Sequence, residues 1–151
     1  MLSKVPEVTL LFWIIKIAAT TLGETAGDAL SMSLNLGYIV STGIFAIIFA
    51  IFVAAQIKAK KHNAFFYWST IIATTTLGTT IADYVDRTLG LGYLGGSLIL
   101  FGLLILSLLA WYYSSGSIAV QSIQSSKSEA FYWLTIMFSQ TLGTALYSIR
   151  I

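Results

Sequence analysis

The sequence predicts an all-α, polytopic membrane protein with five membrane-spanning helices, built from about two and a half parallel two-helix repeats. Three observations lead to this prediction. The chain of 151 residues is 57% hydrophobic and only 9% charged, whereas soluble domains have about 25% charged residues. Its mean hydropathy is +0.85. One motif also recurs three times along the chain, which indicates an internal repeat.

The repeated motif begins at Thr20, Thr75 and Gln140, so the first two copies are 55 residues apart and the last two are 65 apart. The first copy reads Thr-Thr-Leu-Gly-Glu-Thr-Ala-Gly-Asp and ends at Asp28. We therefore divide one transmembrane domain, residues 1–151, into repeat one (1–60), repeat two (61–127) and a half repeat (128–151).

The first apolar segment runs from Val8 to Met32, and Pro6 and Glu7 precede it. Proline and a negative side chain favour the first turn of a helix, so we expect the helix to begin there. Its length suits a membrane crossing, although charged residues interrupt it. The second segment, Leu36–Gln56, has no charge at all.

The third segment, Ala64–Arg87, is uncharged until Asp83 near its end, and the fourth, Leu91–Tyr113, is again uncharged. A serine-rich linker, Ser114–Ser128, accounts for the longer second spacing. The fifth segment, Glu129–Ile151, completes the third copy of the motif. Each of these segments is long enough for a spanning helix, which needs about 20 apolar residues.

The basic residues predict the orientation, because Lys and Arg accumulate in cytoplasmic loops. Arg87 and Arg150 lie on one side of the predicted bundle, and the other side holds Lys4, Lys58, Lys60, Lys61 and Lys127. We expect a multi-pass protein of the cell inner membrane, with its N-terminus in the cytoplasm and its C-terminus outside.

A polar stripe follows one face of the first segment, since side chains three or four residues apart share a helical face. The stripe contains Lys16, Thr20, Gly23, Glu24, Gly27 and Asp28. The third segment carries a similar stripe with Thr79 and Asp83. Charges within a bilayer are costly and face a bundle interior or a wet cavity. We therefore expect Glu24, Asp28 and Asp83 to converge in an interior surrounded by segments one, three and five.

Small residues spaced four apart let helix backbones approach closely. Such residues occur at equivalent places in the repeats, and we predict that they form helix contacts: Gly23, Gly27, Gly78, Ala82 and Gly143. Segments two and four are rich in Ile, Leu and Phe and suit the lipid-facing outer layer.

Carboxylates and hydroxyls at one depth suit hard cations, which prefer oxygen ligands. They also suit proton carriage, because burial of a carboxyl group favours its protonated form. A structural reading stands beside these two. Asp83 and Arg87 are placed to pair with each other, Asp28 to cap a helix end, and Lys16 to neutralise a carboxylate on a neighbouring helix.

Several classes of protein are excluded. The net charge of +2 and the absence of a basic patch argue against nucleic-acid binding. The chain has no cysteine and lacks the motifs of metalloproteases, serine hydrolases and phosphate-binding loops. We predict that the protein is not an enzyme, and we expect no cofactor beyond a hard cation.

The chain resembles a bacterial family of uncharacterised, repeat-containing integral membrane proteins, often labelled membrane-anchored. The resemblance is carried by Lys4-Val5-Pro6 and by Thr20-Thr21-Leu22-Gly23-Glu24, which match the recurring Lys-Val-Pro and Thr-Thr-x-Gly-Glu motifs of that family. It implies a multi-helix membrane fold and no established activity. The family carries Gly-Asp where this chain has Tyr147-Ser148, so the third acidic position is missing here.

Taken together, the residues favour movement or binding of a small cation or proton by Glu24, Asp28 and Asp83, with Lys16 as a resident counter-charge and Thr20 and Thr79 as oxygen ligands. The alternative is a non-transporting interaction or structural subunit. Its expected partners besides the lipid bilayer are copies of itself or another membrane protein.

Overall fold

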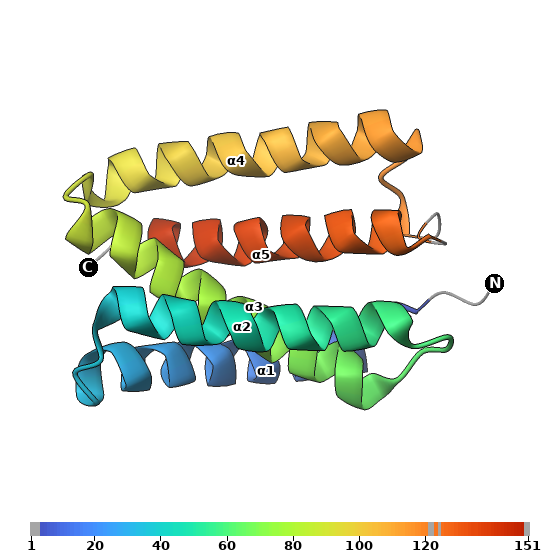
Figure 1. The fold of residues 1–151 in the computed structure, drawn as a ribbon, viewed down its shortest axis with the longest axis horizontal. Helices are drawn as coiled ribbons and strands as arrows, with labels where there is room; N and C mark the ends of the chain where they lie inside the picture. The colour runs from blue at the N-terminus through green and yellow to red at the C-terminus, as the bar shows by residue number, and fades with distance from the viewer. Residues whose placement is uncertain (1–3, 121–122, 124, 150–151) are drawn as a thin grey trace.

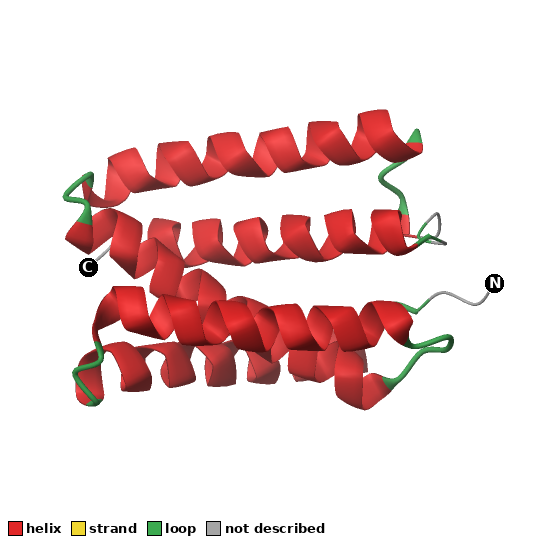
Figure 2. Ribbon diagram, viewed as in Figure 1, coloured by secondary structure: helices red, strands yellow, loops and turns green. Residues whose placement is uncertain are grey.

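The computed structural model describes residues 4–120, 123 and 125–149, and these residues form helices joined by short loops (Figure 2). Five α-helices and two π-helical turns follow one another in the order α1 (Leu10–Asp28), η1 (Ala29–Ser33), α2 (Gly37–Lys58), α3 (Ala64–Asp83), η2 (Tyr84–Thr88), α4 (Gly92–Ser115) and α5 (Ser126–Ser148). The predicted all-α fold with five helical segments is therefore confirmed. Arg150 and Ile151, which the predictions included, lie outside the described residues.

The first helix of each repeat begins at a side-chain cap. Thr9 Oγ1 accepts a hydrogen bond from the Phe12 amide before α1, and Asn63 Oδ1 accepts one from the Phe66 amide before α3. Ser125 Oγ plays the same part before α5. The expected start of the first helix at Pro6 and Glu7 was wrong, because the cap at Thr9 defines the helix start and leaves both residues outside it.

Helix α3 forms the centre of the bundle (Figure 1). Both helices of repeat one, α1 and α2, pack against α3 but hardly touch each other. Both helices of repeat two, α3 and α4, pack against α5 in the same way. Each repeat thus docks on the first helix of the next repeat.

Segments one, three and five are predicted to surround a polar interior, and in the structure α3 lies between α1 and α5. Contacts join α1 to α3 and α3 to α5, but α1 and α5 are not packed against each other. Among the described helices, only α3 is buried along most of its length, because α1, α2 and α5 all pack against it.

The buried face of α3 is rich in threonine. The hydroxyls of Thr74, Thr75 and Thr79 each donate to a backbone carbonyl three or four residues earlier in the same helix. Because a buried hydroxyl without a partner is costly, this back-bonding lets the helix carry polar side chains through the bundle centre.

An aromatic core fills the end of the bundle where α3 and α5 begin. Tyr67 and Trp133 are each 1% exposed, and the Tyr67 and Tyr132 hydroxyls lie 3.1 Å apart within hydrogen-bond distance. Lys4 links three segments at this end of the bundle. Its ammonium pairs with Glu129 at 2.8 Å and donates to the carbonyl oxygens of Gln56 and Ile57 at the end of α2.

Three helical stretches are long and apolar enough to cross a membrane: Leu10–Ser33, Gly37–Lys58 and Gly92–Ser115. Helices α2 and α4 expose large apolar side chains along most of their length, as expected for an outer layer. Such a surface is compatible with lipid and unfavourable in water. These helices are those of a membrane protein.

Candidate functional site

A pocket of about 210 Å³ lies at the end of the bundle where α1, α3 and α5 finish. Two sets of repeat-equivalent residues line it. The first set is Glu24, Thr79 and Thr144, and the second is Asp28, Asp83 and Ser148. The remaining lining residues are Met32, Arg87 and Tyr147. The repeat therefore brings the same two helical positions of all three copies to one pocket.

The acidic residues of the second set stand at the point where each α-helix changes its winding. Helix α1 ends at Asp28 and continues directly as η1, and α3 ends at Asp83 and continues as η2. π-Helical turns are rare and occur often at functional sites. Their recurrence at the same place in two repeats indicates that a π-helical turn is part of the repeat. The sequence did not predict these turns.

The charges in the pocket are unbalanced. Among the described residues that line it, Arg87 is the cation, and three carboxylates face it. The Arg87 Nε atom lies 3.4 Å from Asp83 Oδ1, and the Arg87 guanidinium also donates to the Tyr38 hydroxyl at 3.2 Å. Asp28 lies close enough to interact electrostatically with both Glu24 and Asp83. With every carboxyl ionised, two negative charges remain without a counter-charge.

Burial differs among the three carboxylates. The Asp83 residue is only 4% exposed, whereas Glu24 and Asp28 are exposed on α1. The buried carboxylate of Asp83 is paired with the Arg87 guanidinium, because a charge removed from water needs a partner of opposite sign. The other two acids of the pocket, Glu24 and Asp28, have exposed side chains.

The hydroxyls of the pocket are oriented to accept rather than to donate. Thr79 Oγ1 donates to the Thr75 carbonyl at 3.0 Å, Thr144 Oγ1 to that of Gln140 at 3.4 Å, and Ser148 Oγ to that of Thr144 at 3.1 Å. A hydroxyl has one donor and two acceptor lone pairs. Because its proton is already used, each oxygen presents lone pairs to a cation or to water.

The structure brings together Glu24, Asp28, Asp83 and Thr79 but leaves two predicted residues outside. Lys16 and Thr20 do not line the pocket. Lys16 is half-buried and lies nearer the start of α1, and among the described residues it forms no ion pair with Glu24. The structural pair of Asp83 with Arg87 is present, whereas a pair between Lys16 and a carboxylate is not.

The carboxylates are not arranged as a metal centre. Within the described part of the chain, no group of three acidic or histidine side chains is placed to hold a metal ion. A hard divalent cation takes six or more oxygen ligands, or an octahedral shell that includes waters. The arrangement is better suited to a proton or a hydrated monovalent cation.

The predicted small residues form close contacts at four of five positions. A Cβ built at Gly23 would lie 2.8 Å from Thr75 Cβ, and one at Gly27 would lie 3.3 Å from the Thr76 carbonyl oxygen. Gly78 packs in the same way against Thr141 of α5. Ala82 is fully buried in a small core with Leu100 and Ala145.

Gly143 makes no close contact within the described structure. Apart from the backbone of its own helix, none of the described residues has an atom within 4 Å of a Cβ built there, and α5 is the last described helix. Gly143 stands at the repeat position of Gly23 and Gly78, whose neighbours belong to the next repeat.

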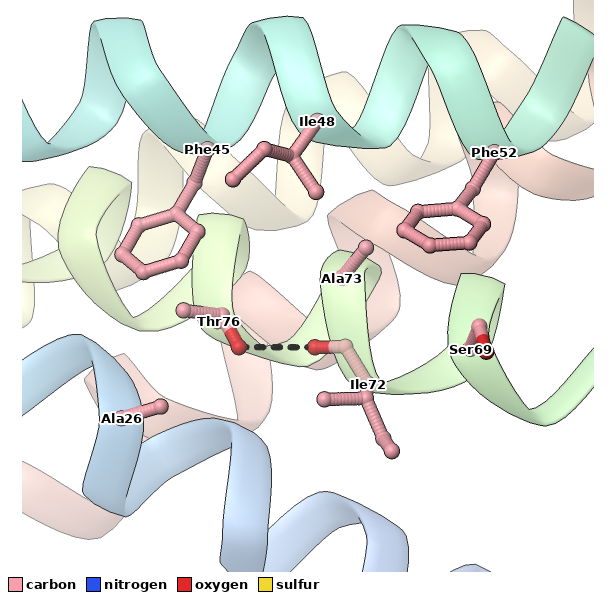
Figure 3. A pocket seen from close by; sticks show the side chains of 8 residues that line it. All are labelled: Ala26, Phe45, Ile48, Phe52, Ser69, Ile72, Ala73 and Thr76. Atoms are coloured by element: carbon pink, nitrogen blue, oxygen red, sulfur yellow. Dashed lines mark hydrogen bonds between the residues drawn. The ribbon is translucent and has the colours of Figure 1, made fainter.

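A second pocket, of about 230 Å³, opens between α1, α2 and α3 (Figure 3). Phe45, Ile48 and Phe52 of α2 form one wall, and α3 forms the other. The hydroxyl of Thr76 is tied to the Ile72 carbonyl at 2.8 Å, as the dashed line in Figure 3 shows. None of the residues that line this groove is charged, and most of them are apolar.

Comparison with known proteins identifies the repeat. Residues 11–62 and 66–117, more than half of the chain, match the family described as Repeat of Unknown Function (DUF347). The two matched stretches cover nearly all of α1 with α2 and of α3 with α4, which confirms that the chain contains an internal repeat. No curated protein and no solved structure matches the chain.

Proposed function

We propose that this chain, which belongs to the DUF347 repeat family, binds a small cation or a proton in the carboxylate pocket and moves it across the membrane. The observation that supports the proposal most strongly is the excess of acid. Glu24, Asp28 and Asp83 line one pocket with Arg87 as the cation opposite them. A charge within a bilayer costs about 2.5 to 3.5 kcal/mol on insertion scales, so such residues mark ion and proton pathways.

The roles of the three acids differ in this proposal. Asp83 is paired with Arg87 and serves as the fixed, buried part of the site. Glu24 and Asp28 exchange the solute, because they line the pocket with exposed side chains and have no ion-pair partner among the described residues. Thr79, Thr144 and Ser148 supply lone pairs that support a cation or a chain of waters.

The membrane arrangement that accompanies this function has all five helices crossing the inner membrane of a bacterium. The N-terminal end lies in the cytoplasm, and the pocket opens toward the outside. The distribution of charge supports this orientation. The pocket end carries Arg87, whereas the opposite end carries Lys4, Lys58, Lys60, Lys61 and Lys127.

The decisive experiment is flux into liposomes containing the purified protein, measured separately for protons, Na⁺ and K⁺. Glu24→Gln preserves side-chain volume and removes one charge. We expect flux of the transported ion to fall at least about tenfold, which corresponds to a transport barrier that is higher by ~1.4 kcal/mol. The melting temperature should be unchanged, because Glu24 is exposed and unpaired in the described structure.

Glu7→Gln is the matched control. Glu7 is the same residue type, is exposed and lies outside the pocket, so its substitution should leave flux at the wild-type rate. Equal flux through wild type, Glu24→Gln and Asp28→Asn would refute the transport proposal.

A second candidate function is that of an interaction subunit without transport. It is favoured by the uncovered face of α5, where Gly143 has no neighbour and Leu146 and Tyr147 are 49% and 68% exposed. In this case Gly143→Trp should abolish co-purification of the partner chain while Glu24→Gln has no effect on it. A lipid-embedded monomer in both variants and in wild type would contradict this candidate.

A further inference from the structure

Another buried acid, Asp86, lies outside the pocket on the side of η2 that faces α4. Asp86 is 5% exposed, and neither of its carboxyl oxygens has a hydrogen-bond partner among the described residues. Ser97, the residue after Gly96 on α4, is also 5% exposed, and its hydroxyl has no partner within the described structure. The carboxyl group of Asp86 is therefore a buried polar group without a hydrogen-bond partner among the described residues.

Gly96 makes the space for this carboxyl group. A Cβ added at Gly96 would overlap Asp86 Oδ1 and would lie 3.1 Å from Asp86 Cγ and 3.2 Å from a methyl group of Val85. Any side chain at this position would displace the acid. The junction therefore contains a long polar side chain from η2 facing a glycine on α4.

Repeat one fills the equivalent junction differently. At the repeat spacing of 55 residues, Ser31 stands for Asp86 and Ser41 stands for Gly96. Both serines are buried, at 6% and 0% exposed. Repeat one thus has two serines where repeat two has an acid and a glycine, so repeat two carries a carboxyl group that repeat one lacks at this position.

The charges around Asp86 do not neutralise it. On its own segment, Arg87 is exposed and pairs with Asp83 and with the Tyr38 hydroxyl of α2. Asp83 and Arg87 lie close enough to Asp86 to interact with it electrostatically, and Tyr93 of α4 lies close to Arg87. No ion pair to Asp86 is present in the described structure. An ionised carboxylate buried without a partner costs several kcal/mol, whereas a protonated one costs far less.

We propose that Asp86 is a proton-binding site separate from the carboxylate pocket, and that it holds a proton while η2 is packed against α4. The ligand is a proton rather than a metal ion, because a single carboxyl group supplies too few oxygens for a bare cation. Loss of the proton leaves an unpaired charge between η2 and α4 and separates them. This inference holds whether or not the pocket transports an ion.

The first test is infrared spectroscopy of the protein in lipid nanodiscs at mildly acidic pH. The difference between wild type and Asp86→Asn should contain the carbonyl stretch of a protonated carboxylic acid. The matched control is Asp83→Asn, whose difference should contain the bands of an ionised carboxylate, because Asp83 is paired with Arg87. A wild type minus Asp86→Asn difference with only ionised carboxylate bands would overturn the proposal.

The second test follows thermal stability with pH. If the folded state keeps this proton while the unfolded chain loses it, wild type loses stability as pH rises. Asp86→Asn should remove that part of the pH dependence and match wild type at low pH within about 5 °C. The double change Asp86→Ser with Gly96→Ser introduces the two serines of repeat one and should remove the same part of the pH dependence. This double variant provides the test if Asp86→Asn does not fold. An unaltered pH dependence in the folded variant, or failure of both variants to fold, would reject the assignment.

Discussion

Gly78 of α3 lies directly against the backbone of Thr141 on α5: a Cβ built at Gly78 would be 3.0 Å from the Thr141 amide nitrogen. Gly23 makes the equivalent contact one repeat earlier, 2.8 Å from Thr75 Cβ on α3. These two contacts set the approach of α1 to α3 and of α3 to α5. The positions of the acids around the pocket depend on that approach.

Gly78→Ala should destabilise the protein. The added methyl group meets backbone atoms that cannot rotate away, and overpacking of this kind costs about 1 to 3 kcal/mol. Gly143→Ala is the matched control, because the same residue stands at the same repeat position with open space around it. There the substitution should be neutral or stabilising by up to about 1 kcal/mol, from helix propensity alone. Thermal unfolding in detergent measures both variants, and equal losses would contradict the contact at Gly78.

Arg87→Gln should strengthen cation binding in the pocket. The change removes the guanidinium 3.4 Å from Asp83 and leaves the three carboxylates with no counter-charge among the lining residues. Because Arg87 is exposed and screened, the expected gain is modest, about 1 kcal/mol or roughly fivefold in affinity. Titration with the transported ion measures the gain, with Lys60→Gln at the opposite end as control. Weaker binding in Arg87→Gln would show that the guanidinium supports the ligand rather than opposing it.

Lys4→Met should destabilise the lysine-rich end of the bundle. Glu129 is 4% exposed and loses the one ion pair that it forms within the described structure, since Lys4 Nζ lies 2.8 Å from its Oε2 atom. Removing one partner of a buried pair costs about 3 to 5 kcal/mol of folding stability. Because Lys4 is partly exposed, we expect a loss of about 3 kcal/mol or less. Adding Glu129→Gln should recover part of the loss. If the double variant is less stable than Lys4→Met, the pair does not account for the effect.

The orientation of the bundle is testable with single cysteines, because the natural chain has none. Lys61→Cys lies in the exposed loop between α2 and α3, and Leu34→Cys lies in the exposed turn after η1. An impermeant thiol reagent applied from the cytoplasmic face should label Lys61→Cys alone, and applied from outside it should label Leu34→Cys alone. The opposite labelling would reverse the proposed topology, and labelling of both from one face would contradict an odd number of crossings between them.

Most of the helical architecture was predictable from sequence, because each segment carries its own signal. The apolar segments Leu36–Gln56 and Leu91–Tyr113 became α2 and α4 with ends shifted by one or two residues. The convergence of Glu24, Asp28 and Asp83 was also predictable. Equivalent positions of a repeat lie at equal depth, and buried charge avoids lipid.

Other features depend on neighbours that no single segment encodes. The central place of α3, the junction of Asp86 with Gly96 and the exclusion of Lys16 from the pocket arise from which faces the helices turn toward one another. The π-helical turns after Asp28 and Asp83 also escaped prediction, because an i, i+5 turn leaves no periodicity over so few residues.

The sequence by itself determined that this protein is helical, membrane-embedded and built from a repeat that carries an acid at one recurring position. These properties follow from local composition and spacing, which act on every segment separately. Only the tertiary structure decided that repeats dock forward onto the next repeat, so that Gly23 and Gly78 are packed while Gly143, with the same local sequence, is bare. The physical reason is that close packing is a property of two surfaces, and the third copy lacks the second surface among the described residues.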